Sequence, residues 1–172
     1  MIYKYRDKVG YKKSEVRIIM DNKSLYNDIL IEHNQYPEHK HEIENPNYVL
    51  EGINPSCGDN IVLQLKINDE GVIEDGGYVG DGCAIFQASC DMMLDLIIGK
   101  SKEEALRLSE IFLRMIKGKI TEEEREELEE AGALTDISHM PSRVKFAVLG
   151  WHTMEEIMEK SEESNDKGDD EA

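Results

Sequence analysis

Two potential metal ligands lie two residues apart in the stretch NPSCGDN, which covers residues 54–60. Cys57 and Asp59 flank Gly58, a residue that adopts positive φ without steric cost and so lets its two neighbours point the same way. A thiolate beside a carboxylate is a mixed soft and hard ligand pair, of the kind that binds zinc or iron. The alternative interpretation is a turn with a buried cysteine and a turn-forming aspartate.

A second cysteine, Cys83, follows residues 80–82 (GDG) at the point where a strand pattern changes to a helical one. Unpaired N–H groups at the start of a helix stabilise a thiolate. Residues 61–67 and 72–79 are predicted to form a hairpin, whose antiparallel strands begin and end at the same end of the sheet. Cys57 precedes this hairpin and Cys83 follows it, so both are expected at the same end of the sheet. Alternatively, Cys83 is a small core residue at a helix start.

The remaining cysteine and the histidines fit this site less well. Cys90 follows Cys83 by seven residues, about 10 Å along a helix, which is too far for both thiolates to bind one ion without distortion. Its core-type neighbours predict that Cys90 packs in the interior. His139 lies just before Pro141 and is a candidate additional ligand. The other histidines are expected to be solvated in a polar stretch (His33, His39, His41) or to lie on a helix face (His152).

The hydrophobic pattern predicts an α+β fold, in which a small three-stranded antiparallel sheet is packed by about five helices. Strands are expected at residues 48–53, 61–67 and 72–79, with the last two joined as a hairpin. Helices are expected over about 24–33, 84–98, 101–117, 121–134 and 141–160, opened at Ser101 and Thr121 by capping boxes. The acidic run EEEREELEEAGAL after Thr121 is expected to be a solvated helix.

The charge of the chain is strongly acidic and unevenly distributed. The net charge is −17 over 172 residues, which argues against nucleic acid as a partner because phosphates would be repelled. Residues 1–19 carry six basic and two acidic side chains, so they are predicted to be a disordered extension, or a sequence upstream of a start at Met20. One domain is expected over residues 20–160, followed by an acidic, disordered tail at 161–172.

Cysteine content and hydropathy indicate the compartment. Three cysteines cannot all be paired in disulfides, so free or metal-bound thiols in a reducing compartment, the cytoplasm, are expected. The longest apolar runs span only a few residues, so no membrane span is predicted. No secretory signal is apparent, because the first residues lack an apolar segment.

Residues 52–93 resemble the NifU/IscU-type family of iron–sulfur cluster scaffolds. The matching motifs are the NPxCGD turn, the hairpin ending in IEDGGYVGDGC, and the helix start behind it. The segment LYNDILIEHNQYP resembles the first helix of that family, so the resemblance covers roughly residues 20–155. Residues 118–141 resemble the insertion of the SufU subgroup, whose members often hold zinc and accept sulfur.

The resemblance implies a scaffold or carrier protein rather than an enzyme. It implies Cys57, Asp59 and Cys83 as ligands for iron, for a transient [2Fe–2S] cluster or, alternatively, for zinc, with Cys57 as the persulfide acceptor. A cysteine desulfurase would supply sulfur, and apo iron–sulfur proteins would receive the product. The family carries a third ligand cysteine near the start of the last helix, where this chain reads PSRVKFAVL. Phe146 therefore leaves the site one thiolate short.

Several functions are compatible with these features. The first is a cluster scaffold or sulfur relay, and a variant of it is a zinc-bound sulfur acceptor that builds no cluster. A regulatory module that has lost cluster assembly is the alternative that Phe146 favours. A thiol enzyme with Cys57 or Cys83 as nucleophile is disfavoured, because the sequence places no histidine base beside either thiol.

Overall fold

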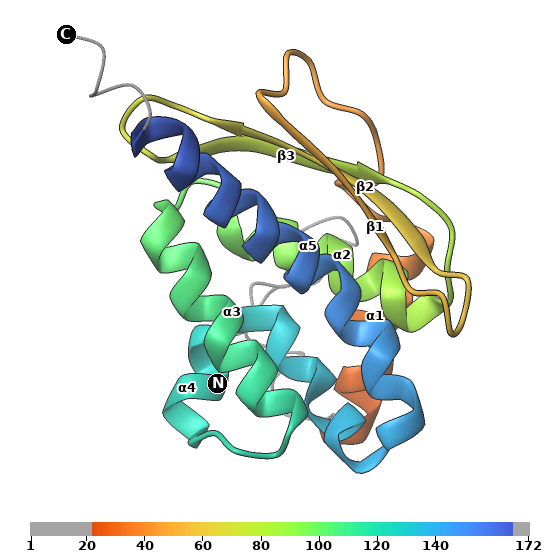
Figure 1. The fold of residues 1–172 in the computed structure, drawn as a ribbon. Coiled ribbons are helices and arrows are strands. Elements are labelled where there is room, and N and C mark those ends of the chain that lie inside the picture. Colours follow the sequence, from red (N-terminus) through yellow and green to blue (C-terminus); the bar gives the residue numbers. More distant parts are fainter. Residues whose placement is uncertain (1–21, 167–172) are drawn as a thin grey trace, which may run out of the picture.

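The sheet and the helices form two layers in the computed structural model, which describes residues 22–166 (Figure 1). The elements are α1 (Asn22–Gln35), β1 (Tyr48–Ile53), β2 (Asn60–Ile67), β3 (Ile73–Val79), α2 (Ala84–Ile97), α3 (Lys102–Ile116), α4 (Glu122–Glu127), the 3-10 helix η2 (Glu129–His139) and α5 (Pro141–Asp166). The strands form one antiparallel sheet in the order β1-β2-β3. The predicted α+β class is confirmed. Within the described residues, no helix combines the length and apolar character that a membrane span requires.

Alternation of side chains along β2 gives the sheet its buried face. Ile61, Leu63, Leu65 and Ile67 are buried, whereas the residues between them are partly exposed. Successive side chains of a strand point to opposite faces, so this pattern directs one face to the helices. Figure 1 shows α5 running beneath the sheet, with α2 beside it.

Strand β3 is enclosed by α2 on one face and by the loop after α1 on the other. Two adjacent glycines allow both approaches: a Cβ at Gly76 would lie 2.7 Å from a methyl of Leu94, and a Cβ at Gly77 would lie 2.3 Å from the carbonyl oxygen of His41. The Tyr78 N–H also donates to the His39 carbonyl at 2.9 Å. The loop after α1 is therefore part of the packed structure.

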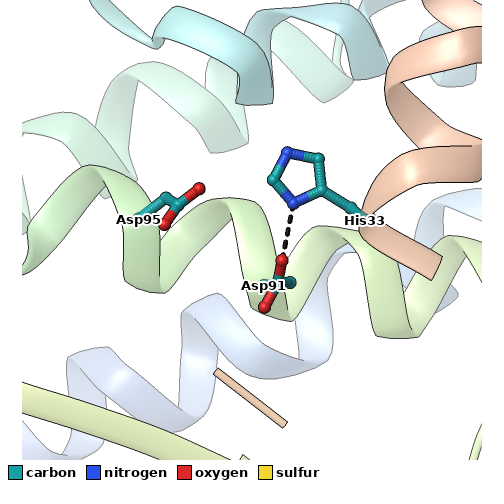
Figure 2. Close-up of side chains that lie close together, drawn as sticks. All are labelled: His33, Asp91 and Asp95. Carbon is teal, nitrogen blue, oxygen red and sulfur yellow. Dashed lines mark hydrogen bonds and ion pairs between the residues drawn. The ribbon is translucent and has the colours of Figure 1, made fainter. Parts of the chain in front are cut away.

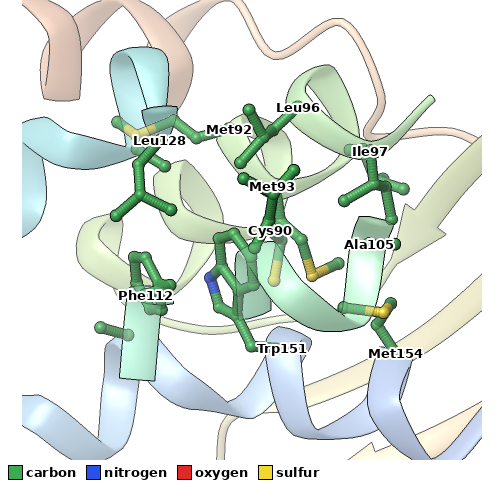
Figure 3. Packing of buried hydrophobic residues seen from close by; sticks show 14 of the residues in the cluster. Cys90, Met92, Met93, Leu96, Ile97, Ala105, Phe112, Leu128, Trp151 and Met154 are labelled. Atoms are coloured by element: carbon green, nitrogen blue, oxygen red, sulfur yellow. The ribbon is translucent and has the colours of Figure 1, made fainter. Parts of the chain in front are cut away.

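Helix α2 lies at the centre of the core, with ten of its 14 residues buried. It is joined to α5 by a buried polar bridge, in which Trp151 Nε1 donates to Ser89 Oγ (3.1 Å) and Ser89 Oγ donates to the Ala147 carbonyl (2.7 Å). The Trp151 ring stacks on Phe112 of α3, with centroids 4.1 Å apart. These contacts tie α2, α3 and α5 into one unit (Figure 3).

Cys90 belongs to this core, as predicted. Its side chain is only 1% exposed, and a Cβ at Gly150 would lie 2.7 Å from its Sγ. Burial, with a smaller contribution from the charge of Asp91, raises the pKa of the Cys90 thiol. The thiol therefore stays protonated, and Figure 3 shows it among the buried hydrophobic side chains beside Trp151.

Ser101 and Thr121 are both helix N-caps, as predicted, but only Thr121 forms a complete capping box, and its helix is shorter than expected. Ser101 accepts from the Glu104 N–H, and Thr121 forms the full reciprocal box with Glu124. The acidic helix ends at Glu127, and the chain continues as the 3-10 helix η2 from Glu129, whose φ is +51°. The prediction of one continuous solvated helix is therefore wrong.

The reason is the spacing of apolar residues in this segment. Buried residues recur at every third position, namely Leu128, Ala131, Leu134 and Ile137, and Gly132 and Ala133 between them are buried as well. A 3-10 helix has three residues per turn, so this spacing places all four on one side, whereas an α-helix would spread them around its axis. The segment thereby buries an apolar stripe against the core.

The C-terminal boundary also differs from the prediction. Helix α5 continues to Asp166, and Ser161 is buried, with its hydroxyl accepting from Lys102 Nζ at 3.1 Å. A disordered tail starting at residue 161 is therefore wrong for residues 161–166. The predicted extension at 1–19 and the rest of the predicted tail, 167–172, lie outside the described residues.

Two of the three histidines predicted to be solvated are enclosed. The ring nitrogens of His33 contact Asp91 Oδ2 at 2.6 Å and Glu130 Oε2 at 2.5 Å, and the side chain is 3% exposed. His39 is also largely enclosed and contacts Asp95. His41 and His152 are exposed, as predicted. Packing of α1 against α2 and η2 covers His33, which the polar sequence around it does not reveal.

His33 forms a charged link between three elements. Burial lowers the pKa of His33, but the hydrogen bonds and charges of Asp91 and Glu130 outweigh burial and raise the pKa from 6.5 to about 9. The imidazolium is therefore the predominant form at neutral pH. It connects α1 to α2 through Asp91 and to η2 through Glu130.

We predict that this link stabilises the fold at neutral pH and is lost in alkali. Because the folded-state pKa exceeds the unfolded value, the contribution is complete below about pH 6.5 and disappears as the pH rises through about 9. A shift of this size corresponds to roughly 3 kcal/mol of unfolding free energy. Urea unfolding between about pH 6 and pH 10 should show this decline in the wild type and in the exposed control His152→Gln. An equal decline in His33→Gln would contradict the assignment.

Candidate functional site

The turn that carries Cys57 is organised by Asn54. The Asn54 carbonyl accepts from the N–H groups of Cys57 (3.3 Å) and Gly58 (2.9 Å), and its N–H donates to the Asp59 carbonyl (2.9 Å). Its side-chain oxygen accepts from the N–H and hydroxyl of Ser56. Gly58 has φ of +78°, as this turn requires. The turn is therefore closed by main-chain bonds around one residue.

Asp59 is the most unusual side chain of the turn. It is 5% exposed, and its Oδ2 is one of only two buried side-chain polar atoms within residues 22–166 that lack a hydrogen-bond partner. A buried carboxylate oxygen without a partner costs free energy. Such an oxygen suits a cation, so the donor chemistry of this site fits a bound metal ion.

The loop before α2 meets this turn, as the hairpin topology predicts. The Asn60 N–H donates to the Asp81 carbonyl at 2.9 Å, and a Cβ at Gly82 would lie 2.9 Å from Asp59 Oδ1. Cys83 is the N-cap of α2, and its side chain is half-buried, as is that of Cys57. Two thiols and a buried carboxylate therefore lie on adjoining loops at one end of the sheet.

The three predicted ligand side chains do not converge on a common point. Among residues 22–166, the groups of potential ligands whose atoms lie within 4.8 Å of one another do not include Cys57, Asp59 and Cys83 together. A cation that binds all three requires their ligand atoms to move closer together. The candidate ligands therefore lie on two adjoining loops, the Cys57 turn and the loop before α2, without forming a closed site.

Phe146 lies beside the turn, where the resemblance implies a third thiolate. The Asn54 side chain donates to the carbonyl of the preceding residue, Lys145, at 3.4 Å. Phe146 is half-buried against the core, and Lys145 Nζ lies 5.3 Å from the centroid of its ring. An apolar ring occupies this edge of the site. His139, the other candidate ligand, is exposed at the end of η2.

A second cluster of potential ligands was missed from the sequence. His33, Asp91 and Asp95 form one group with ligand atoms within 4.8 Å, and Glu38, His39 and Asp95 form another. Figure 2 shows Asp91 and Asp95 on the same side of α2, facing His33 of α1. Two aspartates four residues apart in the largely apolar helix AIFQASCDMMLDLI are the signal that could have revealed them.

Comparison with known families identifies this arrangement. Residues 25–156 match the model of the NifU-like N terminal domain. The chain belongs to this family. This NifU-like domain is 39% identical over 137 residues to the iron-sulfur cluster assembly scaffold protein IscU of Streptococcus pyogenes serotype M1, covering 80% of this chain and 84% of that protein. It is 37% identical over 142 residues to the zinc-dependent sulfurtransferase SufU of Bacillus subtilis (strain 168), covering 83% and 95%.

Solved structures agree with the family assignment. The NifU-like domain superposes with a TM-score of 0.71 on a putative iron-sulfur cluster assembly scaffold protein for the SUF system from Fervidobacterium islandicum AW-1. The two are 34% identical, and the match covers 80% of this chain and 99% of that one. The predicted resemblance to the NifU/IscU and SufU group is confirmed.

Removal of the Asp59 carboxylate should stabilise the metal-free protein. We expect Asp59→Ala to raise the unfolding free energy by about 1–3 kcal/mol after treatment with a chelator, because a buried oxygen without a partner is removed. The control is Asp81→Ala, which removes an exposed carboxylate from the adjoining loop and should change little. Urea denaturation measures both. A less stable Asp59→Ala beside a neutral Asp81→Ala would show that the carboxylate has a stabilising partner.

Proposed function

We propose that this NifU-like domain acts in iron–sulfur cluster assembly as a scaffold and sulfur acceptor. Cys57, Asp59 and Cys83 are the proposed ligands, and iron or a transient [2Fe–2S] cluster is the cargo. The observation that carries the proposal is the buried Asp59 oxygen without a partner, on a turn that adjoins two half-buried thiols. The names of the relatives from Streptococcus and Fervidobacterium support the same role.

The proposed ligand set favours release over storage. Two thiolates and one carboxylate give iron fewer sulfur ligands than the four protein thiolates of a stable [2Fe–2S] centre. The half-buried loops leave the thiols within reach of another protein. A cargo held in this way is exchanged readily, which suits a protein that passes clusters to apo iron–sulfur proteins.

A cysteine desulfurase is the proposed sulfur donor. The Cys57 thiolate attacks the outer sulfur of the persulfide on the desulfurase, and the S–S bond of that persulfide breaks. A persulfide forms on Cys57, and the desulfurase cysteine leaves as a thiolate, so the transfer needs no additional oxidant or reductant. We assign the acceptor role to Cys57 because its turn is exposed on both sides of the cysteine, at Ser56 and Gly58.

Zinc is the second candidate for the bound ion. Zinc binds mixed sulfur and oxygen ligands and needs only four of them. Phe146 removes the third thiolate that a cluster would use, and the relative from Bacillus is named a zinc-dependent sulfurtransferase. In this form, the protein would relay sulfur without building a cluster.

Sulfur transfer provides the direct test. After incubation with a cysteine desulfurase and cysteine, mass spectrometry of the wild type should find one additional sulfur on the peptide that contains Cys57. Cys57→Ser should lose it, whereas Cys90→Ala should retain it because the Cys90 thiol is buried and protonated. Additional sulfur on a different cysteine would assign the acceptor role to that residue instead of Cys57. The absence of additional sulfur on the wild type would contradict the proposal.

Phe146→Cys should lengthen the life of a reconstituted cluster. The substitution adds a thiolate beside the turn, and a [2Fe–2S] cluster requires four protein ligands. Truncation of a fully buried phenylalanine lowers the unfolding free energy by about 3–5 kcal/mol. Phe146 is only half-buried, so the loss in Phe146→Cys should be smaller. The decay of visible absorption in air, after anaerobic reconstitution with iron and sulfide, measures the effect.

The matched control is Val148→Cys, a partly buried position two residues further along α5. It adds a thiol to the same helix at a position outside the predicted ligand set, so it should leave the decay unchanged. A wild-type protein that already holds a complete, long-lived cluster would contradict this prediction.

A further inference from the structure

A second set of ligand atoms lies where the loop after α1 crosses α2. Glu38, His39 and Asp95 have ligand atoms within 4.8 Å of one another, and His39 Nε2 lies 2.6 Å from Asp95 Oδ1. All three side chains are partly exposed. An ion from solvent can therefore reach an imidazole nitrogen and two carboxylates without unfolding of the core.

The main chain holds His39 in place on both sides. Its N–H donates to Asp91 Oδ1 of α2 at 2.8 Å, and its carbonyl accepts from the Tyr78 N–H of β3 at 2.9 Å. A loop residue fixed to both a helix and a strand keeps its side chain in one place. A metal ligand of this kind loses little conformational freedom when the ion binds.

His33 does not compete for the same ion. Its two ring nitrogens are engaged by Asp91 Oδ2 and Glu130 Oε2, so neither offers a lone pair. Asp91 uses one oxygen for His33 and the other for the His39 N–H. The buried pair of His33 and Asp91 therefore helps to position His39 within the group of Glu38, His39 and Asp95.

We propose that Glu38, His39 and Asp95 form a binding site for a divalent transition-metal cation, distinct from the cysteine site. One imidazole and two carboxylates are ligands that zinc, iron(II) and cobalt(II) accept. Binding of the cation to His39 Nε2 and Asp95 Oδ1 replaces the hydrogen bond between these two atoms.

The two sites are separated along one helix. Cys83 caps the first turn of α2, and Asp95 follows it by 12 residues, about 18 Å at the rise of an α-helix. This is too far for a shared ion. Binding at Glu38, His39 and Asp95 is therefore independent of Cys57 and Cys83, so each site can be tested without the other.

Cobalt(II) binding to the full chain distinguishes the two sites. A thiolate ligand gives strong charge-transfer absorption in the near ultraviolet, whereas nitrogen and oxygen ligands give only weak visible bands. In Cys57→Ala/Cys83→Ala, we expect one cobalt ion to remain bound without the thiolate absorption. Adding Glu38→Gln or Asp95→Asn to this variant should weaken that binding at least about tenfold, since even loss of an outer-shell partner has such an effect.

The matched control is His152→Gln in the same background, which removes an exposed histidine that contacts Glu155 and should leave the affinity unchanged. Circular dichroism of each variant identifies any loss of fold, and Glu38→Gln, on the surface loop, keeps the test valid if Asp95→Asn unfolds. The proposal is overturned if the double-cysteine variant binds no cobalt, or if folded Glu38→Gln binds it as tightly as its parent. Neither result affects the sulfur-transfer test at Cys57.

Discussion

The burial of helix α2 is the constraint on which the rest of the structure depends. Ten of its 14 residues are buried, so its axis is set by contacts with the sheet, α1, η2 and α5 together. Ser89 and Cys90 hold it against α5, and Leu94 packs on Gly76 of β3. A helix fixed in this way carries Cys83 at its first turn and Asp95 near its last. The positions of both are consequences of one packing arrangement.

Two buried carboxylates, those of Asp91 and Asp59, differ in whether the protein supplies partners for their oxygens. Asp91 is fully buried, but its oxygens contact His33 and the His39 N–H, so its charge is compensated within the protein. Asp59 is buried to a similar degree, yet one of its oxygens lacks a partner in the described part of the chain. A compensated buried charge is lost only at a cost to the fold when one partner is removed, whereas an uncompensated one is itself retained against a cost. This contrast is why Asp59, rather than Asp91, belongs to the proposed cargo site.

Phe146 stands where the resemblance implies a third thiolate, so it alters the proposed chemistry without altering the fold. The aromatic ring is half-buried at the start of α5, and the turn at Asn54 remains attached to that helix through Lys145. The frame of the NifU-like domain is therefore complete, while the donor set is reduced. A reduced set suits a relay of sulfur or a cluster passed on quickly. The reduced donor set also suits zinc at the cysteine site, because zinc needs only four ligands.

The sequence by itself determined the features that depend on neighbouring residues. The hairpin, the N-caps Ser101 and Thr121, the glycine in the Cys57 turn and the interior place of Cys90 follow from local period and local sterics, and the structure agrees with them. The CGD and GDGC motifs were placed at one end of the sheet because a hairpin returns to its origin. The family resemblance followed from these same motifs.

Only the tertiary structure decided the features that depend on distant residues. His33 is covered by Asp91 and Glu130, which lie 58 and 97 residues away in sequence, so its polar surroundings predicted the wrong environment. The acidic helix broke after Glu127 because Leu128 and the residues at every third position beyond it are buried against the core. Ser161 is enclosed because Lys102 reaches it from α3. In each case, burial between separate elements outweighs local composition, since the free energy of burying a side chain depends on what covers it and not on its neighbours in the chain.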